Sequence, residues 1–294
     1  MKTVFKSLLA AAVIAGAAFG VASAAEEHDL KAQVEHAIAG GHFPVLKPEQ
    51  ENWTFAGIFG KYDKAQLQRG LKVYKEVCSA CHSMHRVAFR NLEDLGYTEA
   101  QVKAFAAEYE VQDGPNADGE MYTRKAVPSD YFPSPFPNTE AAAAANGGAA
   151  PPDFSLIAKA RGVERGFPQF ILDMIPLVGG YQEGGADYIH ALLTGYQEAP
   201  AGVEVAEGTH FNPHFVSGIA LKMAQPISDD QVTYDDGSPQ TLDQYARDVS
   251  AFLMWAAEPK LEERKRTGFM VMVFLAALLG LVYLTKKSVY ANKH

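Results

Sequence analysis

Apolar residues recur at helical spacing in several parts of this chain, and polar capping residues mark where those parts begin. Leu67, Leu71 and Tyr74 lie on one face of a stretch that Asp63 can cap. At 98–101 and again at 241–244, a threonine is followed three residues later by a glutamine, which is the spacing of a capping box. The sequence therefore predicts helices that begin near residues 64, 99 and 242.

Two shorter helices are predicted between these. Thr139 can cap an alanine-rich helix over 141–145 that stops at 146–147. Tyr188, Leu192 and Tyr196 share one face of another helix, which we expect to end before Pro200. Long loops, such as the proline-rich stretch 127–137, connect the helices, and internal repeats are absent. We therefore predict a mostly α fold with long irregular loops.

The first residues have the layout of a secretory signal peptide. Lys2 and Lys6 form a basic start, an apolar run follows over 8–21, and 22–24 supplies small residues for cleavage. The alternative is an uncleaved N-terminal anchor, but the run is too short and wrongly flanked for a stable membrane span. We therefore expect residues 1–24 to be removed and the chain that follows to be exported.

A second apolar segment lies near the C-terminus. Residues 267–285 contain no charged side chain and are long enough for a helix to cross the hydrocarbon core of a bilayer. Basic residues flank the segment on both sides, so their charge does not orient it. With residues 25–262 exported as one large domain, we expect a membrane helix over 263–287 and a cytoplasmic tail over 288–294.

The exported part is acidic. The formal net charge of the whole chain is −9, and loss of Lys2 and Lys6 with the signal peptide lowers it to −11. This charge argues against a nucleic-acid partner and favours a basic protein partner. Acidic stretches at 113–120, 204–207 and 229–236 are the candidates for steering such a partner.

The chain has two cysteines, and both lie in the pattern Cys78-Ser79-Ala80-Cys81-His82. C-x-x-C-H is the attachment pattern of c-type haem. Cysteines three residues apart on a helical turn share one face, so both thiols can reach the vinyl groups of one porphyrin. His82 follows directly, and its imidazole can bind the iron as the proximal ligand.

Other uses of C-x-x-C are less consistent with the surroundings. A thioredoxin-type redox pair needs a βαβ setting, and no run of Val- and Ile-rich strands flanks the motif. A zinc site needs further ligands, and the chain has no other cysteine. A local disulfide suits an oxidising compartment but leaves the adjacent histidine unexplained. We therefore interpret the motif as the attachment site of one haem c.

Methionine is the sixth ligand expected of a haem that carries electrons, because a Met/His pair raises the reduction potential. Met84 is too close to His82 in the sequence to reach the opposite haem face, and Met254 falls in a predicted core helix. A bis-histidine site is the minor alternative. Three candidates in irregular segments remain open: Met121, Met174 and Met223.

A further ordered set of motifs resembles the cytochrome c1 family, the haem subunits of ubiquinol–cytochrome c reductase. The resemblance extends from Phe55 to the C-terminal apolar segment and is strongest to bacterial members, which the signal peptide also fits. Relative to shorter members the chain carries an insert over 162–183, which has no cysteine. The motifs that carry the resemblance are Asp130-Tyr131-Phe132-Pro133, 138–146, Pro151-Pro152-Asp153-Phe154-Ser155, Ala160-Arg161, 185–196, Phe211-Asn212-Pro213 and 248–266.

The resemblance implies which residues contact the haem. Met223 is implied as the sixth ligand, so that His82 and Met223 together bind the iron. Arg161 is implied to contact a haem propionate, which suits a guanidinium because it can form paired hydrogen bonds with a carboxylate. The other pocket residues that the resemblance implies are Asn146, Pro151, Pro152, Tyr188 and Phe215.

The resemblance also implies the function. A protein of this family accepts electrons from a Rieske iron–sulfur protein and passes them to cytochrome c. It does so beside cytochrome b, in a dimeric complex of a respiratory or photosynthetic chain in the bacterial inner membrane. It is an electron-transfer subunit and not an enzyme on its own. The alternatives are a different membrane-tethered monohaem cytochrome, or a haem enzyme or gas sensor with an open sixth position.

Overall fold

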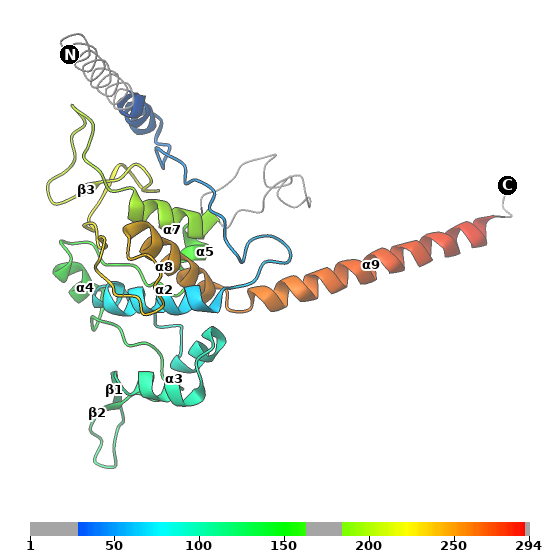
Figure 1. The fold of residues 1–294 in the computed structure, drawn as a ribbon, viewed down its shortest axis with the longest axis horizontal. Helices are drawn as coiled ribbons and strands as arrows, with labels where there is room; N and C mark the ends of the chain where they lie inside the picture. The colour runs from blue at the N-terminus through cyan, green and yellow to red at the C-terminus, as the bar shows by residue number, and fades with distance from the viewer. Residues whose placement is uncertain (1–28, 163–183, 292–294) are drawn as a thin grey trace, which may run out of the picture. The chain divides into compact units, whose positions relative to one another are not determined.

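The computed structural model describes residues 29–162 and 184–291, and these are largely helical with a few short strands (Figure 1). The chain divides into two compact units. The larger unit comprises residues 49–190 and 227–294, and the smaller unit comprises 1–48 and 191–226. The predicted signal peptide and nearly all of the insert lie outside the described residues.

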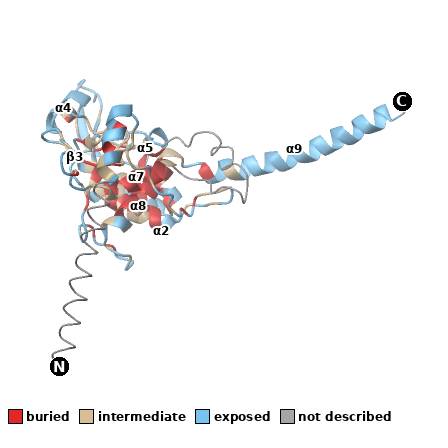
Figure 2. Ribbon diagram, turned by 90° about the horizontal axis from the view of Figure 1, so that it is seen from above, coloured by how far each residue is buried: buried red, intermediate tan, exposed pale blue. Residues whose placement is uncertain are grey.

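Two helices form the core of the larger unit. Helix α2 (Lys64–Glu76) is capped by the carboxylate of Asp63, which accepts a hydrogen bond of 2.9 Å from the N–H of Ala65. Helix α8 (Leu242–Ala257) is capped by Thr241 and packs against α2. Figure 2 shows the buried residues concentrated on these helices and their neighbours. The largest fully buried side chains of the two helices are Leu67, Leu71, Tyr74, Tyr245, Phe252 and Trp255.

Gly70 lets α2 approach α8 closely. A Cβ atom at this position would lie 2.2 Å from the carbonyl oxygen of Asp248 and 2.6 Å from Cβ of Phe252, so a side chain does not fit. One residue earlier, Nε of Arg69 donates to Oδ2 of Asp248 over 2.8 Å, and the Asp248 side chain is fully buried. A buried carboxylate is tolerated only when it is paired in this way. The contact between α2 and α8 therefore combines a close approach of the two helix backbones at Gly70 with an ion pair between Arg69 and the buried Asp248.

Gly70→Ala is expected to destabilise the protein. The new methyl group must push α2 and α8 apart, and overpacking of a core typically costs about 1–3 kcal/mol. Thermal unfolding of the purified protein should show a lower midpoint, by about 2–4 °C for each kcal/mol. Gly218→Ala is the matched control, because no atom lies within 4 Å of the position its Cβ would take. An unchanged midpoint for Gly70→Ala would show that the helices can separate without cost.

Among the described residues, most of the remaining elements are short. A hairpin pairs β1 (Glu110–Asp113) with β2 (Tyr122–Lys125) in antiparallel register. Helix α9 (Leu261–Tyr290) is long and apolar enough to cross a membrane once, and Figure 2 shows it exposed over nearly its whole length. Further elements are η1 (Cys78–Ala80), η2 (Phe89–Leu95), α3 (Glu99–Ala106), α4 (Thr139–Ala145), α5 (Ile157–Ala160) and α7 (Gly184–Thr194).

The predicted helix starts at residues 64, 99 and 242 are confirmed. The capping box at Thr98 is also confirmed, because Thr98 and Gln101 each accept a hydrogen bond from the other's backbone N–H. The second predicted box is wrong in one half: Thr241 caps α8, but the side chain of Gln244 donates to Asp248 over 2.9 Å instead. The buried carboxylate recruits this amide as a further hydrogen-bond donor.

Two other boundaries differ from the prediction. Helix α4 begins at Thr139, two residues earlier than expected, because Asn138 and not Thr139 is the capping residue. The side chain of Asn138 accepts a hydrogen bond from the N–H of Ala141 over 2.8 Å. Helix α7 ends at Thr194, so Tyr196 lies outside it. Gly195 follows directly, and glycine weakens the continuation of a helix.

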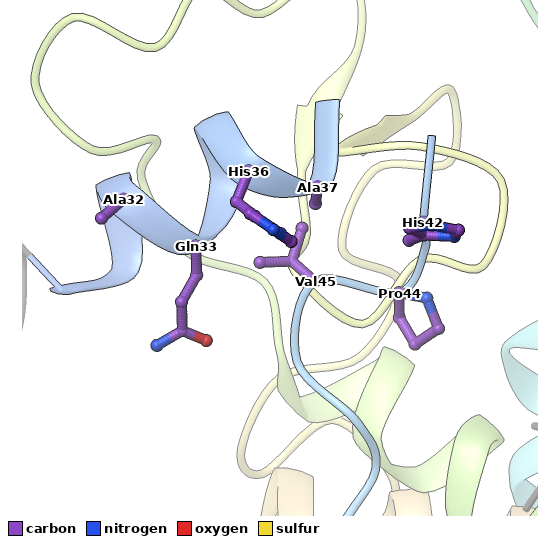
Figure 3. Close-up of a pocket in the computed structure, with 7 residues that line it drawn as sticks. All are labelled: Ala32, Gln33, His36, Ala37, His42, Pro44 and Val45. Atoms are coloured by element: carbon purple, nitrogen blue, oxygen red, sulfur yellow. The ribbon is translucent and has the colours of Figure 1, made fainter. Parts of the chain in front are cut away.

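The smaller unit contains the helix over 29–40 and two short antiparallel strands, β3 (His210–Phe211) and β4 (Ala220–Leu221). Asn212 is fully buried between them, and its side chain donates to the carbonyl of Leu192 over 2.8 Å. An open pocket of about 420 Å³ lies between one face of the helix over 29–40 and the segment that follows it, with His36 and His42 among its lining residues (Figure 3). Two histidines on an open surface are too few ligands for a structural metal site.

Candidate haem site

The C-x-x-C-H motif forms a tight turn at the end of α2. The helix ends at Glu76, and the 3₁₀ turn η1 follows at once. The carbonyl oxygen of Cys78 accepts hydrogen bonds from the N–H groups of Cys81, over 3.1 Å, and His82, over 2.9 Å. This turn gives the motif the local helical geometry that the spacing predicts, and it is held by the packing of α2 on α8.

Both cysteines are free thiols, one buried and one exposed. Burial raises the pKa of Cys78 to about 12, and the neighbouring Cys81 raises it further in the same direction. A thiol with such a pKa stays protonated at neutral pH, whereas a redox nucleophile or a zinc ligand must be a thiolate. Cys78 is therefore not an activated nucleophile in this environment.

His82 is oriented by the backbone of a distant segment. Its Nδ1 lies 2.8 Å from the carbonyl oxygen of Pro152, and the side chain is buried. A carbonyl oxygen can only accept, so Nδ1 carries the hydrogen and Nε2 keeps its lone pair. A histidine that binds a metal is typically held in this manner by a hydrogen bond to its second nitrogen.

The environment also keeps the imidazole neutral. Burial lowers the pKa of His82, and this effect outweighs the hydrogen bond to Pro152 and the charge of Asp153, which act in the opposite direction. Only the neutral ring can donate a lone pair to a metal. The two thiols and the free Nε2 nitrogen are thus the donor set that a covalently attached haem requires, and the residues fit this cofactor.

The segment 151–155 is fixed against the turn by a network around Asp153. Its carboxylate accepts from the hydroxyl of Ser83 over 2.7 Å and from the N–H of His85 over 3.1 Å. Burial raises the pKa of the Asp153 carboxyl, but hydrogen bonds from Ser155, Ser83 and His85 outweigh it and hold the pKa below its usual value. Asp153 is therefore ionised at neutral pH and ties the two segments together.

Aromatic rings support His82 from the side. The ring of Phe154 stacks on the imidazole, with 3.9 Å between the centroids and 16° between the planes. The hydroxyl of Tyr74, on α2, donates to the carbonyl of His82 over 3.2 Å. Tyr74 also contacts Phe252 of α8, with 5.8 Å between centroids. The candidate ligand is thus connected to the helical core.

The sequence indicated some of these roles and missed others. The motif 151–155 was recognisable, but it pointed to pocket residues and not to a carbonyl that fixes the tautomer of His82. The Asp-x-Ser pattern at 153–155 does indicate a local turn in this segment. Asp153 accepts a hydrogen bond from the N–H of Ser155 two residues later, as in an Asx turn. No sequence pattern indicated that Tyr74 would bind the backbone of His82.

The other predicted pocket residues of the larger unit occupy varied positions. Tyr188 is buried on α7, and Pro151 is half-buried. The side chain of Asn146 donates to the carbonyl of Ala142 over 2.7 Å, at the end of α4. Arg161 is exposed directly after α5 and forms no ion pair with the described residues. A guanidinium without such a pair is available to an external carboxylate.

The candidate methionines fall into different environments. Met84 and Met254 are buried in the core of the larger unit, and Met121 is 60% exposed just before β2. Met174 lies outside the described residues. Met223 is half-buried in the smaller unit, where its carbonyl accepts a hydrogen bond of 3.0 Å from the hydroxyl of Tyr196. Phe215 belongs to the smaller unit as well, so the roles of Met223 and Phe215 at the haem remain predictions.

The three acidic stretches also differ. Asp113 pairs with Arg124, and Asp235 pairs with Lys72 over 3.2 Å. Glu204 and Glu207 are exposed and form no ion pair within the described part of the chain, and the same is true of Asp118 and Glu120 in the first stretch and of Asp230 in the third. Charges that are not neutralised internally contribute most to the steering of a partner.

Comparisons with known proteins agree with these features. The model of the Cytochrome C1 family matches residues 53–293. The chain is 57% identical over 252 residues to the cytochrome b/c1 of Bradyrhizobium diazoefficiens, covering 84% of this chain but only 36% of that longer protein. It is 45% identical over 262 residues to the cytochrome c1 of Rhodospirillum rubrum, covering 83% of this chain and 88% of the relative.

A plant mitochondrial protein is equally similar. The cytochrome c1-2 heme protein of Solanum tuberosum is 45% identical over 252 residues, and the alignment covers 85% of each chain. The matched region contains the C-x-x-C-H turn, the segment 151–155 that orients His82, and helix α9. On this evidence, the chain belongs to the cytochrome c1 family.

Proposed function

We propose that this chain is a one-electron carrier of a quinol–cytochrome c reductase. It accepts electrons from a Rieske iron–sulfur protein and passes them to a cytochrome c, in a respiratory or photosynthetic chain. The observation that carries the proposal is the orientation of His82. The Pro152 carbonyl fixes the tautomer of His82 that leaves Nε2 free, and this histidine directly follows the C-x-x-C pair, whose two thiols are both free. The haem supplies the redox chemistry when it is attached, and the protein sets its potential and access.

The proposed attachment uses Cys78 and Cys81, and the proposed iron ligands are His82 and Met223. These two residues would hold the iron, and a Met/His pair suits a haem that transfers electrons. The exposed guanidinium of Arg161 would bind a propionate. Asn146, Pro151, Pro152, Tyr188 and Phe215 complete the proposed pocket. Support for Met223 and Phe215 comes from the family resemblance.

The proposed topology follows from the two apolar segments. Residues 1–24 are a signal peptide, 25–262 a periplasmic haem domain, 263–287 a membrane anchor and 288–294 a cytoplasmic tail. Helix α9 supports the anchor, since it covers the whole of 263–287. This arrangement would hold the haem domain at the outer surface of the bacterial inner membrane, beside cytochrome b and the Rieske subunit in a dimeric complex.

Purification through a tag placed after His294 tests the proposed complex. From native membranes in mild detergent, the chain should co-purify with a cytochrome b and an iron–sulfur protein. Quinol added to this preparation should reduce the haem c of the chain, and oxidised cytochrome c should then reoxidise it. A different membrane-tethered cytochrome would co-purify without cytochrome b, and its haem would not respond to quinol.

A further inference from the structure

A short apolar loop precedes α2 in the larger unit. Residues 57–61 (Gly-Ile-Phe-Gly-Lys) place two large apolar side chains in solvent: Ile58 is 44% exposed and Phe59 is 74% exposed. Adjacent exposed residues of this size on a loop are unusual on a soluble surface and often mark a contact site. The neighbouring aromatic residues Trp53 and Phe55 are buried, so the exposure is confined to the loop tip.

The loop is fastened to the start of α9. The ammonium group of Lys265 donates to the carbonyl of Phe55. The N–H of Tyr62 donates to the carboxylate of Glu262 over 3.0 Å, and its hydroxyl donates to the carbonyl of Glu258 over 3.2 Å. These bonds lie on both sides of the loop tip. The position of Ile58 and Phe59 is therefore fixed relative to the first turns of α9.

The loop tip reaches the beginning of the apolar segment. The ring of Phe59 meets the ring of Phe269 edge to face, with 5.4 Å between centroids. Arg266 is the last charged residue before the uncharged stretch 267–285. At a rise of about 1.5 Å per residue, Phe269 lies only about 4.5 Å beyond Arg266 along the helix. Phe59 is thus at the level where the charged part of α9 gives way to its apolar part.

Two positively charged side chains lie near the start of the apolar part of α9. Lys61 and Arg266 are both exposed, and neither forms an ion pair with any described residue. Aromatic side chains at the boundary of the hydrocarbon core, with lysine and arginine beside them, are typical of a protein at a membrane interface. Anionic lipid head groups attract such cations.

We propose that the loop 57–61 is a second membrane contact, in which Ile58 and Phe59 enter the lipid interface beside α9 while Lys61 and Arg266 face the head groups. The partner is lipid and not another polypeptide. The inference requires α9 to cross the membrane, but it does not depend on the haem or on the proposed electron-transfer partners. The contact would limit the tilt of the exported domain relative to the bilayer, because it adds a second fixed point near the anchor.

Photo-crosslinking in native membranes tests the contact. The full chain would carry p-benzoylphenylalanine in place of Phe59, and after illumination its mass would be measured. We expect a gain of one phospholipid. The same substitution at Leu279, 71% exposed on α9, should give lipid adducts and thereby verifies the span. The substitution at Met121, 60% exposed beside the β1–β2 hairpin, is the matched control and should give none.

Adducts of Phe59 with another protein subunit, or no adduct while Leu279 reacts, would overturn the proposal. The same holds if Met121 captures lipid as efficiently as Phe59. Should the Phe59 variant fail to accumulate, Ile58→p-benzoylphenylalanine carries the same expectation. Covalent haem staining of each variant reports separately on the haem site, so failure of the lipid contact and failure of the proposed function are distinguishable.

Discussion

Met223→Leu is expected to lower the reduction potential of the haem by on the order of 0.2 V or more, within the roughly 0.8 V over which axial ligands set haem potentials. A thioether ligand opposite histidine raises the potential, and leucine cannot replace it. The sixth position would then be open, so the ferrous form should bind carbon monoxide. A redox titration and a reduced spectrum with carbon monoxide measure both effects.

Met121→Leu is the control for this substitution. Met121 is exposed beside the hairpin and was the alternative in the described part of the chain, so its replacement should leave the potential and the spectrum unchanged. If Met223→Leu left the potential at the wild-type value and Met121→Leu lowered it, the ligand assignment would be reversed. If neither changed it, Met174 or a histidine would become the candidate.

Cys78→Ser combined with Cys81→Ser is expected to abolish covalent haem. Serine hydroxyls do not form the thioether bonds, and the haem should be lost from the denatured polypeptide. Haem staining of the chain on a denaturing gel measures this, with an immunoblot to show that the chain accumulates. Ser79→Ala is the matched control within the same turn. Ser79 donates to the carbonyl of Lys75 over 2.7 Å, away from the thiols, so this variant should keep its stain. Persistent stain in the double variant would refute the attachment site.

The helices could be predicted where the information is local. Asp63, Thr98 and Thr241 each lie directly before an amphipathic stretch, and each caps a helix in the structure. The errors arose where another residue competed for the same role. Asn138 and Thr139 are both good caps, and the sequence alone does not decide between adjacent candidates. Gln244 was assigned to the capping box, but the buried Asp248, four residues later, attracts its amide.

The site could be predicted only in part for a similar reason. Cys78, Cys81 and His82 are contiguous, and their spacing indicates their chemistry. The groups that orient His82 come from positions far away in the sequence: Pro152 acts through its carbonyl oxygen, which is present in every residue, and Tyr74 through a hydroxyl on α2. Such contacts depend on tertiary packing. Periodicity and capping patterns carry no information about them, and the family resemblance implied Pro152 only as a pocket residue, not as the group that orients His82.

The mass of the intact mature chain, purified from its native membrane and denatured, tests the central claim most directly. The account predicts the mass of the polypeptide from about residue 25 onward plus one haem, with the haem retained on a peptide that contains residues 78–82. A chain with the mass of the bare polypeptide, and with the sulfurs of Cys78 and Cys81 joined in a disulfide, would contradict it.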